Sequence, residues 1–339
     1  MHNPIYQLLT IMKTANYFLI TIAFVASSFL SSCSELTSVE PLPEGSGSAT
    51  TEERVSAQST TQEEPNSPQE PTMGQLLTAG NITSYTVEKN RSYGPDKLQN
   101  YDLYRPVGTG ESVPSVSVVL IHGGGWSLLD KSFLDPVVEE FKKRNVNVTI
   151  FNINHRLAGS PGVNFPQIME DLDLFFEHQQ SLKSELNLND DVVLWGYSSG
   201  GHLALTYAYK RKKRFIKSVA AVAAPADLTQ PSIYNGIVDD KNRNLTALLL
   251  GGTYDQKPEA YQDASPIFEV DGNSVPTVLF YGDNDQIVDD QNQGERLHTA
   301  LKGRNVKTRF HAVSDATHEM HGKMPGIVNN TINFWKTLN

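Results

Sequence analysis

From about residue 79 to the C-terminus, short apolar runs alternate with longer amphipathic stretches, and this alternation limits the folds open to the chain. Residues 115–121 form a continuous, mostly apolar run that is short enough for a strand buried on both faces. Strands that alternate with helices favour a mainly parallel sheet covered by helices on both faces. We therefore predict one α/β domain over residues 79–339, with an eight-stranded, mainly parallel sheet and a small cap.

The individual elements follow from the same patterns. Residues 229–266 are less regular than the rest and are expected to form the cap. The expected strands cover residues 84–88, 99–104, 115–121, 147–152, 191–195, 216–223, 277–281 and 307–313. The expected helices cover residues 131–143, 165–186, 199–212, 290–301 and 322–338.

Composition separates this domain from the N-terminal part of the chain. Residues 34–78 are rich in Ser, Thr, Glu, Gln and Pro, and residues 34–73 hold eight glutamates against one arginine, so most of the net charge of −10 lies there. Such a segment buries too little apolar surface to offset the entropy of ordering, and we predict a disordered linker. The chain has no basic cluster of the kind that nucleic-acid binding needs, so no nucleic-acid partner is expected.

The only cysteine, Cys33, excludes a disulfide within the chain. The apolar run 17–30 follows Lys13 and has the length of a signal-peptide core, which is too short to span a bilayer comfortably. Leu30-Ser31-Ser32-Cys33 resembles the bacterial lipobox, in which the cysteine is lipidated and becomes the new N-terminus. The resemblance implies a lipoprotein signal over residues 1–33 and a place in the bacterial cell envelope, periplasmic or outer-membrane, with lipid as the only membrane contact. An ordinary secretory signal is the alternative.

Gly196-Tyr197-Ser198-Ser199-Gly200 fits the pattern G-x-S-x-G and lies between a predicted strand and a predicted helix. The pattern alone is weak, but the strand–turn–helix setting is the one that a nucleophile elbow requires. A serine on so tight a turn has strained backbone angles, which are tolerated only where the residues two positions away, Gly196 and Gly200, lack side chains. Ser198 is therefore the predicted nucleophile. The alternative is a serine in a glycine-rich turn without catalytic meaning.

His122-Gly123-Gly124-Gly125-Trp126 directly follows a predicted strand. Acyl transfer places negative charge on the former carbonyl oxygen, and fixed backbone N–H groups stabilise that charge. We expect these oxyanion-hole donors to be Gly124, Gly125 and Ser199. No Lys-Ser or Lys-Thr follows the glycines, so a phosphate loop is not indicated. His122 is expected to hold the loop through hydrogen bonds rather than to transfer protons.

A serine nucleophile needs a carboxylate that orients its histidine base, and in a strand–elbow–helix fold the chain order is serine, acid, histidine. Gly282-Asp283-Asn284-Asp285 follows the predicted strand 277–281. We predict Asp285 as the acid, because the spacing G-x-x-D-x-x-V resembles the acid turn of many hydrolases that use a serine nucleophile. Asp283 and Asp289 in the same turn are the alternatives.

His318 lies on the loop between the last predicted strand and the last predicted helix, where the base is expected, and His321 is the alternative. His311 lies within the strand and is expected to be scaffold. His202, near the start of the elbow helix, is expected to support the site rather than act in acid–base catalysis. The run 318–321 is not H-E-x-x-H, so no zinc-peptidase site is indicated. No metal or organic cofactor is implied.

Together these residues resemble the carboxylesterase and hormone-sensitive-lipase-like branch of the α/β-hydrolases, and the nearest likeness is to bacterial feruloyl and acetylxylan esterases with a BD-FAE-like domain. The resemblance covers about residue 85 to the C-terminus. One stretch departs from the Y-R-L-A-P pattern of the hormone-sensitive group, with His155 in place of Tyr and Gly159 in place of Pro. The matching stretches are residues 101–106 (YDLYRP), 122–126 (HGGGW), 154–158 (NHRLA), 196–204 (GYSSGGHLA), 250–253 (LGGT) and 263–267 (DASPI).

The resemblance and the motifs together imply a serine esterase that works through an acyl-enzyme. The expected substrates are short-chain, acetyl or aryl esters, either small molecules or esters linked to a polysaccharide. Fold does not determine substrate, so two rival functions stay open. One is an amidase or peptidase on the same fold, and the other is an inactive hydrolase-like domain used for binding.

Overall fold

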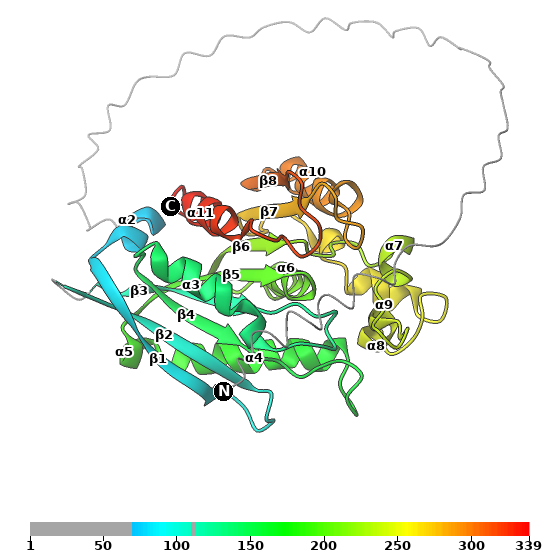
Figure 1. Ribbon diagram of the computed structural model, residues 1–339, viewed down its shortest axis with the longest axis horizontal. Coiled ribbons are helices and arrows are strands. Elements are labelled where there is room, and N and C mark those ends of the chain that lie inside the picture. The colour runs from blue at the N-terminus through cyan, green and yellow to red at the C-terminus, as the bar shows by residue number, and fades with distance from the viewer. Residues whose placement is uncertain (1–69, 110–112, 339) are drawn as a thin grey trace, which may run out of the picture. The chain divides into compact units, whose positions relative to one another are not determined.

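Eight strands form one sheet in the computed structural model of the protein, which describes residues 70–109 and 113–338 (Figure 1). Their order across the sheet is β1-β2-β4-β3-β5-β6-β7-β8. The two pairs β1–β2 and β2–β4 are antiparallel, and every other neighbouring pair is parallel, which confirms the predicted sheet. The strands are β1 (Asn81–Ser92), β2 (Asn100–Thr109), β3 (Ser115–Ile121), β4 (Val148–Ile153), β5 (Leu188–Tyr197), β6 (Ile216–Val222), β7 (Thr277–Gly282) and β8 (Thr308–Val313).

The central strands are buried on both faces, which explains their continuous apolar runs. Every residue of β3, β4 and β7 is buried, whereas the edge strand β1 is mostly exposed. Because these central strands are parallel, their C-terminal ends meet along one edge of the sheet. The loops that follow β3, β5 and β7 therefore leave the sheet at the same edge, where ligand sites of open α/β sheets lie.

Helices cover both faces of the sheet. Buried side chains of α4, α6 and α10 belong to the apolar core on one face, and those of α2, α3 and α11 belong to the core on the other. The helices are α2 (Met73–Thr78), α3 (Asp135–Lys143), α4 (Phe165–Ser181), α5 (Lys183–Leu186), α6 (Ser199–Arg211), α7 (Pro231–Tyr234), α8 (Leu245–Leu250), α9 (Pro258–Asp263), α10 (Arg296–Gly303) and α11 (Met324–Trp335).

Three helices predicted as continuous are subdivided. The stretch 131–143 begins as a 3-10 turn, η1 (Lys131–Leu134), because Pro136 is tolerated only in the first turn of an α-helix and α3 therefore starts beside it. The stretch 165–186 breaks after Ser181 into α4 and α5. The stretch 290–301 begins with a π-helical segment, η3 (Asp290–Glu295), before α10.

The predicted linker over residues 34–78 ends too late, because its last six residues form α2. Thr72 caps this helix through reciprocal hydrogen bonds with Gln75, the arrangement known as a capping box. Its apolar residues join the core that also contains α3 and α11. The average composition of the linker concealed both the capping pattern and these three buried residues, Met73, Leu76 and Leu77.

The segment predicted as a cap contains three short helices, α7, α8 and α9, which lie together at the right of Figure 1. Stacking of Tyr234 on Tyr254, with ring centroids 4.4 Å apart, packs this segment, and Tyr261 lies edge-on to Tyr254 at 5.3 Å. Tyr261 also donates a hydrogen bond to the Gly252 carbonyl at 3.0 Å. Aromatic packing therefore helps to hold the cap together.

The signal over residues 1–33, Cys33 and the linker up to residue 69 lie outside the described residues. Among the helices of residues 70–109 and 113–338, none combines the length and the apolar character that crossing a bilayer requires.

Candidate active site

Ser198 lies on the turn between β5 and α6, at the C-terminal end of a central strand. Its φ is +51°, in the left-handed region, where a non-glycine residue costs on the order of 1–3 kcal/mol. A Cβ added to Gly196 would lie 2.3 Å from the carbonyl oxygen of Gly200, and one added to Gly200 would lie 2.1 Å from that of Ile121. The strained turn predicted from the two glycines is confirmed, and their missing side chains let it close against β3.

A continuous chain of hydrogen bonds joins Ser198, His318 and Asp285. His318 Nε2 lies 2.9 Å from Ser198 Oγ, and His318 Nδ1 lies 2.8 Å from Asp285 Oδ2. The carboxylate of Asp285 is fully buried, whereas 15% of the His318 side chain is exposed. The structure thus brings together the three residues that the sequence predicted as nucleophile, base and acid, although they lie up to 120 positions apart.

Backbone groups fix the orientation of the Asp285 carboxylate. The N–H groups of Ile287 and Val288 donate to its Oδ1 at 2.8 and 2.9 Å, which leaves Oδ2 for His318. A carboxylate only accepts, so the ring proton of His318 belongs on Nδ1, and the bare Nε2 can accept from the hydroxyl of Ser198. The assigned tautomer is therefore the one that a general base for Ser198 requires.

The acid turn and the histidine loop lie directly against each other. The Asn284 N–H donates to the carbonyl of Ala316 at 3.1 Å. A Cβ added to Gly282 would lie 2.1 Å from that same oxygen, so only glycine permits the contact. The Tyr197 hydroxyl donates to the carbonyl of His318 and fixes the loop from the other side. The sequence analysis missed this role of Tyr197, because no local pattern pairs it with His318.

The alternative acids and bases stand elsewhere. Asp283 is exposed, and Asp289 caps η3 by accepting from the N–H of Asn292 at 2.6 Å. His321 is exposed and lies before α11. His311 lies on β8 with its ring stacked on Phe280 at 4.8 Å. Within the described residues, none of these four side chains shares a hydrogen bond with Ser198 or His318.

The glycines of residues 122–126 form the loop after β3, close to the nucleophile. The φ angles of Gly124 and Gly125 are +110° and +56°, which favour glycine. A Cβ added to Gly123 would lie 3.3 Å from Ser198 Cβ. In the described part of the chain, the N–H groups of these three glycines donate no hydrogen bond to another backbone group.

Gly123 is the member of this loop that the sequence analysis did not include among the donors. Its added Cβ would have Tyr197 and Ser198 as nearest neighbours, whereas one on Gly124 would meet Leu128 and one on Gly125 would meet Leu245 of α8 at 2.4 Å. The glycine that abuts the nucleophile is therefore the first of the three. Only the contact between two loops distant in sequence reveals this.

His122 is buried at the start of this loop and holds it through local contacts. Its Nδ1 hydrogen-bonds to the carbonyl of Gly123 at 2.7 Å, and its ring stacks on His155 with centroids 4.6 Å apart. Burial, reinforced by His155, lowers the pKa of His122 to about 3, so the ring is neutral near pH 7. These contacts agree with the predicted supporting role.

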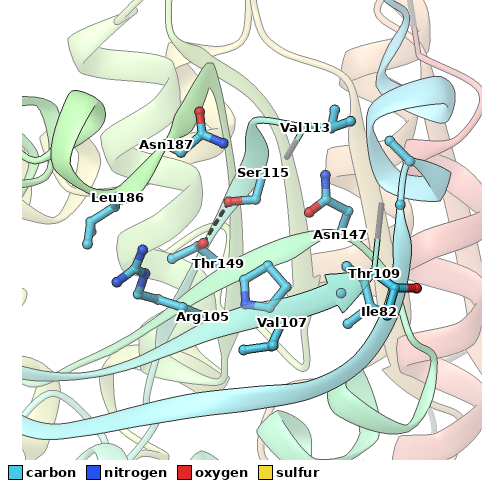
Figure 2. Close-up of a pocket in the computed structure, with 14 residues that line it drawn as sticks. Ile82, Arg105, Val107, Thr109, Val113, Ser115, Asn147, Thr149, Leu186 and Asn187 are labelled. Carbon is cyan, nitrogen blue, oxygen red and sulfur yellow. Dashed lines mark hydrogen bonds between the residues drawn. The ribbon is translucent and has the colours of Figure 1, made fainter. Parts of the chain in front are cut away.

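A ligand could also bind to the described residues away from Ser198. In residues 70–109 and 113–338, no three His, Cys, Asp or Glu side chains gather in a way that could hold a metal ion. A cavity of about 280 Å³ opens at the N-terminal ends of β3 and β4, beside β2 (Figure 2). Arg105, Ser115 and Thr149 line it, and the hydroxyls of the last two lie 2.7 Å apart. This cavity lies at the end of the parallel strands opposite to Ser198.

Comparison with known proteins places the chain in a family. The family model described as BD-FAE matches residues 101–301, more than half of the chain. The chain belongs to the BD-FAE family. By family it is an esterase-type hydrolase, and by fold an α/β-hydrolase. The match to this BD-FAE domain runs from β2 into α10 and so includes Ser198 and Asp285, whereas His318 lies beyond it.

Solved structures share the fold of this BD-FAE protein at low identity. A truncated carbohydrate esterase from gut microbiota is 18% identical, with a TM-score of 0.61, and the match covers 76% of this chain and 97% of that one. Esterase B from Lactobacillus rhamnosis is 20% identical, with a TM-score of 0.60 and coverage of 75% and 85%. Carboxyl esterase 2 from Tuber melanosporum is 20% identical, with a TM-score of 0.59 and coverage of 76% and 87%.

A curated relative by sequence is the non-reducing polyketide synthase trt4 of Aspergillus terreus, which is 28% identical over 141 residues. The match covers 38% of this BD-FAE chain and only 6% of the synthase. It therefore likens the chain to a small part of a much larger protein.

Proposed function

We propose that this protein is a serine hydrolase of carboxylic esters, with Ser198 as nucleophile, His318 as general base and Asp285 as the carboxylate that orients it. The observation that carries the proposal is the hydrogen-bonded chain from Ser198 Oγ through both ring nitrogens of His318 to the buried carboxylate of Asp285. A serine hydroxyl alone is a weak nucleophile, and this arrangement is the one that activates it.

The proposed reaction has two steps. Ser198 Oγ attacks the ester carbonyl carbon while its proton passes to His318 Nε2, and Asp285 stabilises the resulting imidazolium. Collapse of the tetrahedral intermediate breaks the ester C–O bond, and the alcohol leaves with the proton from His318. Water then attacks the acyl-enzyme with His318 again as base, which releases the carboxylic acid and restores Ser198.

The negative oxygen of the tetrahedral intermediate needs donors that are already in place. We infer that these are the backbone N–H groups of Gly124, Gly125 and Ser199, with Gly123 as a further candidate because it abuts Ser198. Ser199 is the first residue of α6, so the helix dipole adds to the stabilisation. Loss of one such donor costs about 10²–10³ in kcat in enzymes of this kind.

As substrates we propose short-chain, acetyl or aryl esters, either free or linked to a polysaccharide. The support is membership of the BD-FAE family and a fold shared with proteins named as carbohydrate and carboxyl esterases. A panel of acetyl, butyryl and feruloyl esters with a matching anilide measures this preference. Faster cleavage of the anilide than of the ester would favour an amidase, and a folded protein without turnover of any substrate would favour a binding domain.

The decisive variant is Ser198→Ala, measured on p-nitrophenyl acetate. We expect at least about a thousandfold loss of kcat, because the variant lacks the nucleophile. The melting temperature should stay unchanged, because the substitution disrupts no packing in the core. Ser181→Ala is the matched control: this exposed serine ends α4, and the variant should keep the wild-type rate. Retention of more than a tenth of the wild-type rate in Ser198→Ala would remove Ser198 from the mechanism.

We also propose that Cys33 carries lipid, that residues 34–72 tether the hydrolase domain, and that the enzyme works in the bacterial cell envelope. The support is the run Leu30-Ser31-Ser32-Cys33 after an apolar segment, ahead of a polar, acidic stretch. Two or three acyl chains at about 0.8 kcal/mol per buried methylene would hold the protein on a membrane. Cells that express wild type and Cys33→Ala should show the first in the membrane fraction and the second released. Equal amounts of both proteins in the soluble fraction would contradict lipidation and favour an ordinary secretory signal.

A further inference from the structure

The loop of residues 122–126, called the oxyanion loop from here on, contains a strained backbone conformation at a residue that is not glycine. Trp126, which follows Gly125, has a φ of +60°, and its side chain is fully buried. A bulky residue in the left-handed region costs on the order of 1–3 kcal/mol and persists only where its surroundings determine it. The contacts of Trp126 therefore show what holds this loop beside Ser198.

Those contacts centre on His202. The indole N–H of Trp126 donates to His202 Nδ1 at 3.0 Å, and the two rings lie edge-on with centroids 5.2 Å apart. His202 Nε2 lies 2.7 Å from the carbonyl oxygen of Ala264. All three residues are fully buried, so water does not compete for these bonds.

The chemistry of the partners determines the protonation state of His202. An indole nitrogen only donates and a carbonyl oxygen only accepts, so Nδ1 must be bare and Nε2 must carry the proton. The direction of the chain is thus Trp126 Nε1–H to Nδ1, and Nε2–H to Ala264 O. A neutral imidazole satisfies both partners at once, whereas a protonated one would turn a donor toward the indole N–H.

The same histidine is tied to the nucleophile. His202 lies one turn into α6, and its backbone N–H donates to the carbonyl of Ser198 at 3.0 Å. Ala264 caps the C-terminal end of α9, where helix carbonyls have no partner within the helix. One side chain therefore joins three stretches of the sequence: the oxyanion loop, the elbow helix and the end of the cap.

We propose that His202 is a positioning residue that holds the oxyanion loop in register with Ser198 through the hydrogen bond to Trp126, anchored on Ala264. The proposal rests on the proposed ester hydrolysis, because the loop donates to an oxyanion only in that reaction. Misplaced donors weaken binding of the transition state and leave binding of the ground state unchanged. The expected effect is therefore on kcat and not on KM.

Two variants remove the hydrogen bond from its two ends. Trp126→Phe deletes the donor, and His202→Phe deletes the acceptor while keeping a ring of similar size. After normalisation of active enzyme by titration with an organophosphate, we expect each to lower kcat on p-nitrophenyl acetate about ten- to a hundredfold, with KM within about twofold of wild type. The double variant should lose little more than either single one, because both remove the same interaction.

Trp335→Phe is the matched control. Trp335 is also fully buried, but its indole nitrogen has no hydrogen-bond partner in the part of the chain that the structure describes, so the same substitution deletes no such bond there. It should keep the wild-type kcat. His202→Gln is the rescue variant, since a carboxamide can accept from Trp126 and donate to Ala264. The kcat of His202→Gln should be at least about threefold higher than that of His202→Phe.

A spectroscopic signature tests the bond without any turnover. The three tryptophans give three indole N–H signals in a ¹⁵N-correlated NMR spectrum. Among the described residues, only Trp126 has a hydrogen-bonded indole nitrogen, since those of Trp195 and Trp335 find no partner there. The signal lost in Trp126→Phe should lie downfield of the other two and should move upfield in His202→Phe. If wild type cleaves no ester, the proposed function fails while this signal still tests the bond.

The proposal is overturned by any of three results. These are multiplicative losses in the double variant, equal changes of kcat and KM, or a Trp126 signal that stays unmoved in His202→Phe. If His202→Phe does not fold, Trp126→Phe alone decides through its kcat and KM against those of Trp335→Phe. A wild-type kcat in Trp126→Phe would then refute a positioning role.

Discussion

Asp283 and Asp285 stand two positions apart on the same turn, yet their surroundings differ. The carboxylate of Asp285 is buried and bonded to His318, whereas Asp283 is exposed. Asp285→Asn should lower kcat on p-nitrophenyl acetate by about 10³–10⁴, because an amide no longer stabilises the imidazolium or the required tautomer. Asp283→Asn should stay within about threefold of wild type. A larger loss in Asp283→Asn would move the acid to that residue.

At the scale of single residues, the sequence predicted those that lie in a recognisable local pattern. Ser198 lies within G-x-S-x-G, and Asp285 and His318 follow late strands in the expected order. The partners of Tyr197 and His202 were not predictable, because a hydroxyl bonded to the His318 carbonyl and an imidazole bonded to Ala264 depend on how distant loops meet. The sequence placed His202 beside the site and gave no indication of what it holds.

At the scale of elements, the close contact between the acid turn and the histidine loop depends on Gly282, the last residue of β7. Gly282→Ala would place a Cβ 2.1 Å from the Ala316 carbonyl oxygen and force the loops apart. We expect a loss of about 1–3 kcal/mol in the free energy of unfolding, with a fall of at least tenfold in kcat because His318 lies two residues beyond Ala316.

Gly303→Ala provides the matched control for that prediction. Gly303 ends α10 and is exposed, and among the described residues an added Cβ would meet no atom within 4 Å beyond its chain neighbours and its own helix. The substitution should leave kcat unchanged and the free energy of unfolding within about 0.5 kcal/mol. Equal behaviour of the two alanine variants in urea unfolding and in turnover would show that the two loops do not need this contact.

The elements themselves were predictable to different degrees for physical reasons. Strands buried on both faces, such as β3, are continuous apolar runs, and the predicted range 115–121 matches the observed strand. Breaks inside helices depend on tertiary contacts, so the division of residues 165–186 at Leu182 was missed. The helix α2 was missed because six residues with a capping box were averaged into a polar segment.

For the whole molecule, buried neutral histidines make stability depend on pH. Burial lowers the pKa of His202 to about 4 from its ordinary value of 6.5, and the bond to Ala264 only partly opposes this. Between these two values the unfolded chain binds a proton that the folded protein does not. The stabilisation is therefore complete above pH 6.5 and is lost as the pH falls toward 4.

This shift predicts a measurable difference between wild type and His202→Gln, whose side chain does not titrate. From pH 7 to pH 5 the wild type should lose about 2 kcal/mol of unfolding free energy through His202 alone. The unfolding free energy of the wild type relative to that of His202→Gln, measured by urea unfolding at each pH, should therefore fall by that amount. His321→Gln, which replaces an exposed histidine, is the control variant. A difference between wild type and His202→Gln that stays constant from pH 7 to pH 5 would mean that His202 is not held neutral, and that the chain from Trp126 to Ala264 does not persist in solution.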